Sequence, residues 1–273
     1  MNFNNSKPLI MGILNVTPDS FSDGGKYNHI DAAVQQAGLM LAEGADIIDI
    51  GGESTRPGSD PVSSDEQISR VIPVIAAIRK QFADKVAISI DTTLSTVAEA
   101  ALNKGANLIN DVSAGLNDPN ILTLADKRLV PIILMHSQGT PLTMQVNPYY
   151  EDVVTEVINF LKARIAAALA AGVSKNNIVI DPGIGFGKRK QDNLDLLANL
   201  DEFVALGFPV LLGASRKRFM GTICDVTDPF ELVTATAVTT ALGVMAGVKV
   251  FRVHDVKANH QAADVAWAIK QSR

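Results

Sequence analysis

The chain has 273 residues, of which 47% are hydrophobic and 19% are charged, and its net charge is −5. With 20 glycines and 12 prolines, its composition is that of an ordinary globular protein, which excludes collagen-like, low-complexity and disordered classes. A net charge of −5 gives no polybasic footprint, so nucleic acid and membrane surfaces are not expected as partners. The length suits one large domain, and we treat residues 1–273 as a single domain.

The cysteine content and the apolar stretches of the sequence indicate the cellular compartment of the protein. The single cysteine, Cys224, cannot form an internal disulfide, which is typical of a reducing compartment and predicts a cytoplasmic protein. The first residues lack the basic region and cleavage site of a secretory signal. Residues 232–248 carry no charge but are slightly short for a membrane span, so they predict a buried helix of a globular domain.

Short apolar runs of strand length alternate along the chain with helical segments. The predicted strands lie near residues 9–14, 46–50, 86–90, 107–111, 130–135, 177–181, 209–214 and 249–253. Helices are predicted at 29–44, 64–82, 94–104, 118–127, 151–171, 190–205, 229–246 and 256–271. Strands that alternate with helices indicate βαβ units and a parallel sheet. Eight such units in a chain of this length predict an α/β fold, a (β/α)8 barrel of the TIM type.

A polar residue closes or soon follows every predicted strand. These residues are Asn15, Asp49, Asp91, Asn110, His136, Asp181, Lys217 and Arg252 with His254. Any one of them alone could be a helix cap or a turn former. In a barrel, however, active sites lie at the carboxyl ends of the strands. Polar residues at all the strand ends therefore indicate a binding site at one mouth of the barrel.

The last predicted strand carries two groups that suit an anionic substrate. Arg252 and His254 are two residues apart and therefore share one face of the strand. An arginine beside a histidine is a plausible clamp for phosphate or pyrophosphate, and residues 215–218 add further cations after the preceding strand. The alternative is a solvated basic patch paired with Asp255.

Three other strand ends suit a heterocycle. Asp181 can accept parallel N–H bonds from an amidine-like edge, and Phe186, a few residues later, offers a stacking surface. The glycines between them lack the spacing of a dinucleotide-binding motif. Asp91 and Asn110 close two consecutive strands and together present acceptors and donors. Asp91 could equally cap the helix at 94–104, and Asp181 could belong only to an Asp-Pro-Gly turn.

Two glycine-rich loops, residues 15–25 and 51–58, complete the predicted mouth. Both are rich in side-chain oxygens and are predicted to close over an anionic substrate and exclude water. The sequence contains no His/Cys cluster with the spacing of zinc ligands. An oxygen ligand such as Asn15 suits Mg2+ that is bound mainly through substrate phosphate and water.

Five motifs together resemble the dihydropteroate synthase family of bacterial folate biosynthesis. They are NVTPDSFSDGG at 15–25, GGESTRPG at 51–58, DPGIGFGK at 181–188, GASRK at 213–217 and RVHDV at 252–256. The resemblance extends over residues 9–269, with the motifs in the same order. It implies a transferase that joins 7,8-dihydropterin-6-ylmethyl diphosphate to 4-aminobenzoate, giving 7,8-dihydropteroate and diphosphate. It further implies dependence on Mg2+, a homodimer and inhibition by sulfonamides.

The resemblance also assigns roles to residues. Those implied to hold the pterin are Asp91, Asn110, Asp181 and Lys217. Those implied to hold the diphosphate are Thr55, Arg252 and His254, together with Asn15 as the metal ligand. Those implied to frame 4-aminobenzoate are Phe21, Arg56, Pro57, Phe186 and Ser215, with Met135 and Gly213 also in the substrate-binding set. The implied catalytic residues are Asp23, Asp91, Lys217 and Arg252, with Asp23 helping to assemble the closed site.

Two other functions remain open from the sequence. A methyltetrahydrofolate-type methyltransferase would share the Asp/Asn/Asp grip on the pterin, but it has no use for a pyrophosphate clamp. A non-catalytic pterin-binding barrel should have lost some of the residues at the mouth, and the motifs show no such loss.

Overall fold

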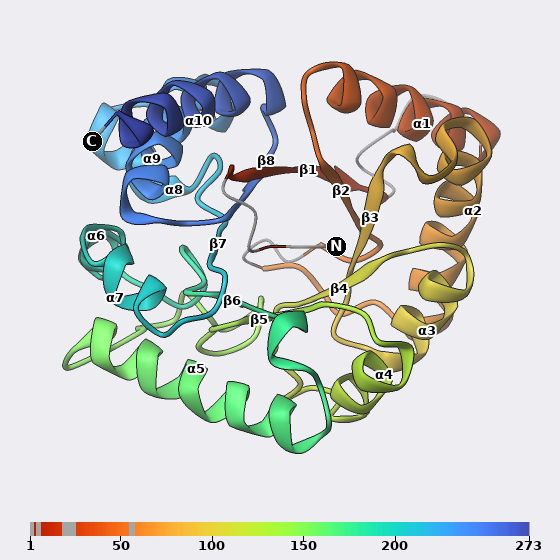
Figure 1. Ribbon diagram of the computed structural model, residues 1–273, viewed down its shortest axis with the longest axis horizontal. Helices are drawn as coiled ribbons and strands as arrows, with labels where there is room; N and C mark the ends of the chain where they lie inside the picture. The colour runs from red at the N-terminus through yellow and green to blue at the C-terminus, as the bar shows by residue number, and fades with distance from the viewer. Residues whose placement is uncertain (1–2, 4–6, 18–25, 55–57, 273) are drawn as a thin grey trace.

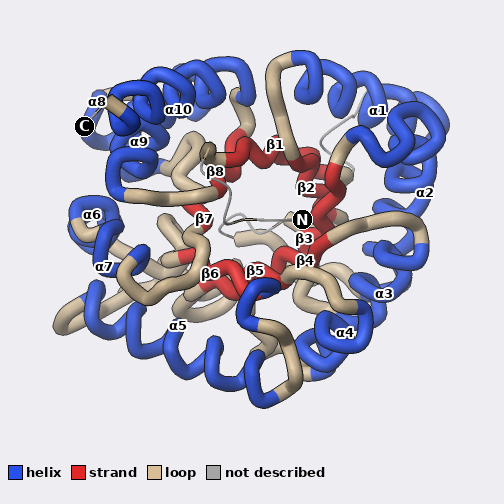
Figure 2. The backbone as a smooth tube through the Cα atoms, in the orientation of Figure 1, coloured by secondary structure: helices blue, strands red, loops and turns tan. Residues whose placement is uncertain are grey.

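The computed structural model describes residues 3, 7–17, 26–54 and 58–272, which form a barrel of parallel strands inside a ring of helices (Figure 2). The strands are β1 (Leu9–Asn15), β2 (Ile47–Gly51), β3 (Ala87–Asp91), β4 (Leu108–Asp111), β5 (Ile132–Met135), β6 (Ile178–Asp181), β7 (Leu211–Leu212) and β8 (Val250–Val253). They pair in the order β6-β5-β4-β3-β2-β1-β8-β7. A parallel bridge between Ile180 and Val210 joins β6 to β7. The predicted (β/α)8 barrel is confirmed.

The helices follow the strands in the predicted alternation (Figure 1). They are α1 (Lys26–Ala42), α2 (Ser64–Phe82), α3 (Ser95–Asn103), α4 (Asn120–Arg128), α5 (Val153–Ala170), α6 (Lys190–Ala198), α7 (Leu200–Val204), α8 (Arg218–Cys224), α9 (Val233–Ala246) and α10 (Val256–Gln271). Helix starts have local causes: the Asp152 side chain, for example, accepts bonds from the backbone N–H groups of Val154 and Thr155 at the start of α5.

Three elements differ from the prediction. The helix expected over 190–205 is split into α6 and α7, because the Asn199 side chain donates to the carbonyl of Asp195 at 2.7 Å and caps α6. Strand β7 is shorter than the predicted 209–214 at both ends, and at its start Pro209 has no N–H for the ladder. The short helix α8 was not predicted, and it follows directly on Lys217.

The inward side chains of the strands form two layers of opposite character. One layer is apolar and consists of Met11, Ile47, Leu108, Ile133, Val179, Leu211 and Val250, with Phe3 packed against them. Side chains two positions further along a strand face the same interior. Here these are Ile13, Asp49, Ser89, Asn110, Met135, Asp181, Gly213 and Arg252. Five of these eight residues, Asp49, Ser89, Asn110, Asp181 and Arg252, are polar, so the interior becomes mostly polar within two residues, at the carboxyl ends of the strands.

Helix α9 corrects the prediction of a buried helix at 232–248. Three of its threonines, Thr236, Thr239 and Thr240, are buried, and their hydroxyls find acceptors: for example, Thr239 Oγ1 donates to the Thr236 carbonyl and Thr240 Oγ1 to Asn259 Oδ1, both at 2.7 Å. On the other face, Val238 is 54% and Leu242 60% exposed. The helix is thus half-buried on the outside of the barrel. In the part of the chain that the structure covers, no helix has the length and apolar character needed to cross a membrane.

Candidate active site at the barrel mouth

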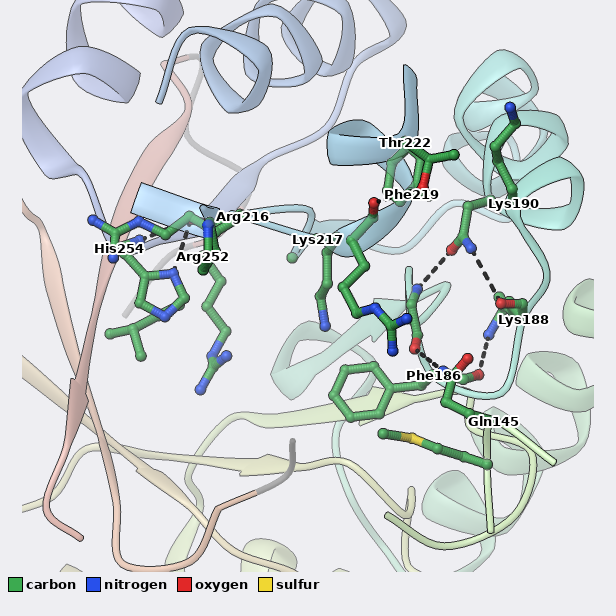
Figure 3. A pocket seen from close by; sticks show the side chains of 18 of the residues that line it. Gln145, Phe186, Lys188, Lys190, Arg216, Lys217, Phe219, Thr222, Arg252 and His254 are labelled. Carbon is green, nitrogen blue, oxygen red and sulfur yellow. Dashed lines mark hydrogen bonds between the residues drawn. The ribbon is translucent and has the colours of Figure 1, made fainter. Parts of the chain in front are cut away.

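The loops at the carboxyl ends of the strands enclose a cavity of about 660 Å³ (Figure 3). Several predicted site residues line it: Asn15, Phe186, Gly213, Ser215, Lys217, Arg252 and His254. Others are buried in the strand interior and do not line it: Asp91, Asn110, Met135 and Asp181. The remaining predicted residues, Phe21, Asp23, Thr55, Arg56 and Pro57, lie outside the described residues.

Arg252 is held by two carboxylates from neighbouring strands. Its Nε donates to Asp49 Oδ2 at 2.6 Å and its Nη2 to Asp91 Oδ2 at 2.7 Å. Asn110 Nδ2 donates to the same Asp49 oxygen at 3.2 Å. Burial by itself lowers the pKa of the Arg252 guanidinium, but the two carboxylates outweigh it and raise that pKa, so the arginine stays charged. Asp91 and Asn110, predicted to hold the pterin, and Arg252, predicted to hold the diphosphate, are thus linked in one hydrogen-bond network.

Asp181 keeps one carboxylate oxygen available. Its Oδ1 accepts the backbone N–H of Gly183 at 2.7 Å, and in the described part of the chain Oδ2 has no hydrogen-bond partner. Gly213 faces this carboxylate, since a Cβ there would lie 3.8 Å from Asp181 Oδ2. Burial raises the pKa of Asp181 to about 6, opposed by the Gly183 N–H and by Lys217. Asp181 can therefore accept an N–H group from a ligand that enters above Gly213.

Lys217 and Phe186 form the neighbouring wall of the cavity. The Lys217 Nζ lies 4.2 Å from the centroid of the Phe186 ring, and Figure 3 shows the lysine extending toward that ring. Burial and the nearby charge of Arg252 together lower the pKa of Lys217 to about 8, while Asp181 opposes the shift. The lysine is a cation at neutral pH that stands over an aromatic surface.

The loop that presents Phe186 is braced from behind by Lys188. The buried Lys188 Nζ donates to the carbonyls of Gly183 at 2.9 Å and Phe186 at 3.1 Å, and lies 2.9 Å from His136 Nδ1. Burial lowers the pKa of His136 to about 3, so the neutral ring can accept this bond. Gly183 has φ +70 and packs so closely that a Cβ there would lie 1.8 Å from the His136 carbonyl oxygen. Only glycine fits at that position.

Two further contacts hold the last strands together at the mouth. Ser215 Oγ lies 3.0 Å from His254 Nδ1 and accepts the His254 backbone N–H at 3.1 Å. Arg216 forms a two-bond pair with Asp255, at 2.9 and 2.6 Å, so it is the arginine that pairs with Asp255. Arg252, by contrast, points its charge into the barrel, which excludes a solvated basic patch as the role of this residue.

Sequence reasoning counted Asp49 and His136 among the polar strand ends at the mouth but assigned them no role, and it left Lys188 out of the predicted site. Asp49 lies two residues after Ile47, whose side chain faces the barrel interior, so the alternation along the strand could have placed Asp49 there too. Lys188 stands inside the DPGIGFGK motif, but a lysine in a loop gives no local sign that it is buried. The bond between Lys188 and His136 joins two loops that are 52 residues apart, and only the fold reveals it.

The site combines acceptors for a heterocycle edge with cations for an anion, on one mouth of a barrel. This arrangement is that of a pterin-binding enzyme, and the pterin binding enzyme family matches residues 11–254 of this chain. The dihydropteroate synthase of Haemophilus influenzae is 49% identical over 93% of this chain and 90% of its own length. The chain therefore belongs to the dihydropteroate synthases, which are transferases.

Solved structures agree with this assignment. The Yersinia pestis dihydropteroate synthase, solved as a sulfonamide drug complex, superposes with a TM-score of 0.91 at 42% identity, covering 99% of this chain and 96% of its own. The Xanthomonas albilineans enzyme, solved with 4-aminobenzoic acid, gives a TM-score of 0.91 at 43% identity, covering 99% and 95%. These relatives are named as synthases rather than methyltransferases.

Proposed function

We propose that this chain condenses 7,8-dihydropterin-6-ylmethyl diphosphate with 4-aminobenzoate, giving 7,8-dihydropteroate and diphosphate for tetrahydrofolate biosynthesis. The observation that carries the proposal is that the available Asp181 oxygen lies next to Gly213, in the wall of the cavity that Lys217, Arg252 and His254 also line. A pterin edge presents N–H groups and a diphosphate presents anionic oxygens, so one substrate satisfies both halves of the site.

The proposed pterin subsite lies among Asp91, Asn110, Asp181 and Lys217. Asp181 Oδ2 accepts N–H groups of the heterocycle, and the Asn110 carboxamide is oriented by its bond to Asp49. Met135 is buried beside Asp181 in the strand register and gives the ring an apolar neighbour. Gly213 leaves the space above Asp181 open.

The proposed diphosphate subsite lies around Asn15, Arg252 and His254. A carboxamide oxygen such as that of Asn15 fits Mg2+, which takes few protein ligands and is bound mostly through phosphate and water. Among the described residues no cluster of three or more His, Cys, Asp or Glu side chains could hold a metal, and a single oxygen ligand at the cavity wall is compatible with a metal that arrives with the substrate. When bound, Mg2+ neutralises negative charge on the leaving diphosphate.

The reaction breaks the C–O bond between the pterin methylene and the diphosphate and forms a C–N bond to the aromatic amine, which then loses a proton to solvent. Negative charge grows on the leaving group, and Arg252 and His254 are placed to stabilise it. Phe186 and Ser215 line the neighbouring wall, where 4-aminobenzoate or a sulfonamide in its place would lie. An aromatic amine is a weak base, so no strong general base is required.

The proposed reaction is tested by diphosphate release from purified protein. We expect release only when both substrates and Mg2+ are present, with 7,8-dihydropteroate formed in equal amount. Chelation of the metal should stop turnover, and added Mg2+ should restore it. Release without the amine would indicate a hydrolase, and pterin binding without any release would indicate the non-catalytic barrel.

The proposed enzyme is a homodimer, and helices α9 and α10 support an interface. These helices pack against each other on the outside of the barrel (Figure 1). Besides Val238 and Leu242 on α9, Val265 is 61% and Ile269 51% exposed on α10. Exposed large apolar side chains on adjacent helices are typical of a contact between subunits. A cytoplasmic location stays a prediction from cysteine usage.

Substitution of Leu242 by glutamate is expected to separate the dimer. A charge at the centre of an apolar interface is costly to bury, whereas Leu242 is already exposed in the single chain, so the fold should be retained. Sedimentation analysis should show a monomer for Leu242→Glu. The matched control is Leu129→Glu on the far side of the barrel, at a residue that is 77% exposed, and this variant should remain dimeric. A wild-type chain that sediments as a monomer contradicts the proposed dimer.

A further inference from the structure

Asp49 stands at the centre of the site network without lining the cavity. It is fully buried within β2, and the residues that line the cavity do not include it. Its Oδ2 accepts Arg252 Nε, from β8, at 2.6 Å and Asn110 Nδ2, from β4, at 3.2 Å. One carboxylate oxygen therefore fixes two side chains that the proposed function assigns to different parts of the substrate.

Stability does not account for a carboxylate at this position. Asp49 Oδ1 is buried and has no hydrogen-bond partner among the residues the structure describes. A buried charge with an unsatisfied oxygen is costly, and apolar side chains often serve the stability of a core better than a buried ion pair. Ile13 and Met135, inward residues in the same layer as Asp49, show that this layer of the interior accepts apolar side chains.

The geometry of the guanidinium shows what the carboxylate does. Asp49 and Asp91 occupy Nε and Nη2, which fixes the orientation of the planar group. In the described part of the chain, the third nitrogen, Nη1, has no hydrogen-bond partner. The Arg252 side chain is 19% exposed and lines the cavity, so that its remaining donors are available to a ligand.

We infer that Asp49 is a positioning residue for the transfer reaction: it aims the free donors of Arg252 at the substrate diphosphate and orients the Asn110 carboxamide beneath the pterin. This inference rests on the proposed function. Because the contact with Arg252 is charge-assisted and shorter than the one with Asn110, its loss should affect the diphosphate subsite more than the pterin subsite.

The test is the Asp49→Asn variant, which keeps the volume of the side chain and removes its charge. We expect kcat/KM for the pterin diphosphate to fall about 10- to 100-fold, because small misplacements of a substrate-contacting group cost that much. The KM for 4-aminobenzoate should stay within about twofold of wild type, since the hydrogen-bond partners of Asp49 among the described residues are Arg252 and Asn110 rather than Phe186 or Ser215. By calorimetry, affinity for Mg2+-diphosphate should fall more than affinity for a pterin without phosphates.

A matched control and a double variant separate positioning from folding. Ser89 is the partner of Asp49 in the strand register, and its buried hydroxyl has no partner among the described residues, so Ser89→Ala should leave both kinetics and stability unchanged. If Asp49 acts through Arg252, adding Asp49→Asn to Arg252→Lys should cause little further loss.

Wild-type turnover tests the proposed reaction by itself, and the ratio of variant to wild type tests Asp49. The inference would be overturned by an Asp49→Asn enzyme with unchanged kcat/KM for the pterin diphosphate. It would also be overturned if kcat/KM fell equally for both substrates. Should Asp49→Asn not fold, Asp49→Ser is the second variant, because it leaves room for a water beside Arg252. If neither variant folds, Asp49 serves stability and the inference is wrong.

Discussion

Asp181→Asn is expected to reduce pterin affinity by about 100-fold or more while keeping its fold. The reason is that a charge-assisted hydrogen bond is replaced by two donors that face each other, which costs about 3 kcal/mol of binding free energy. The amide oxygen of the variant can still accept the Gly183 N–H, as Asp181 Oδ1 does at 2.7 Å. The amide nitrogen then takes the place of Oδ2 next to Gly213, where it meets the N–H groups of the pterin. Calorimetry with a pterin that carries no phosphate measures the loss.

The matched control is Asp111→Asn, at a buried carboxyl whose two oxygens already accept bonds from Ser113 and Gly115. This variant should lower the melting temperature and leave pterin affinity near wild type, which is the reverse of the pattern for Asp181. Near-normal pterin affinity in a folded Asp181→Asn protein would remove Asp181 from the pterin subsite.

The pH dependence of pterin binding gives a second measurement on Asp181. Burial raises the pKa of this carboxyl to about 6, and its protonated form offers a poorer acceptor to the ligand. Affinity of the wild-type enzyme for the pterin should therefore fall as the pH drops through about 6. Burial also raises the pKa of Asp91, against the opposing charge of Arg252. A flat profile in Asp181→Asn identifies Asp181 as the group that titrates, and an unchanged slope assigns the titration elsewhere.

Arg252→Ala is expected to reduce both turnover and stability. Turnover should fall by at least about 1000-fold, because the leaving diphosphate loses a positioned cation, an effect of several kcal/mol. Two buried carboxylates, Asp49 and Asp91, are left without their shared partner, which costs about 3–5 kcal/mol of unfolding free energy. Affinity for diphosphate should fall more than affinity for a pterin that lacks phosphates.

The stability of Arg252→Ala should depend on pH with a definite sign. Burial already raises the pKa of Asp91 to about 7 in the folded state, against the opposing charge of Arg252. Without the arginine this opposition is lost, so the folded-state pKa of Asp91 rises further above its unfolded value. The folded state then binds more protons, so the loss of stability should shrink as the pH is lowered from 8 toward 5. Thermal unfolding of wild type and Arg252→Ala across this pH range measures the difference in stability. A stability difference that is constant with pH would show that the protonation of Asp91 does not depend on Arg252.

The sequence alone determined the barrel, because alternating apolar strands and helices leave few other ways to bury their apolar faces. It also placed the polar residues at the strand ends, since a parallel barrel brings those ends to one mouth. Asp181 and Lys217 were found this way, and Phe186 was found as an aromatic residue in the loop that follows Asp181. The short helix α8 and the split between α6 and α7 were missed, because one turn of helix and a single capping asparagine give a weak local signal.

Only the tertiary structure decided which site residues contact one another and which remain available to substrate. Asp91 and Arg252 are 161 residues apart in sequence, and Asp49 and Arg252 are 203 apart. Each could have faced substrate alone, and the barrel instead joins them in one hydrogen-bonded network. The same holds for Lys188, whose burial under its own loop follows from contacts with His136 on the neighbouring strand end. A residue's place at a strand end is a local property of the sequence, whereas its partner is set by closure of the barrel.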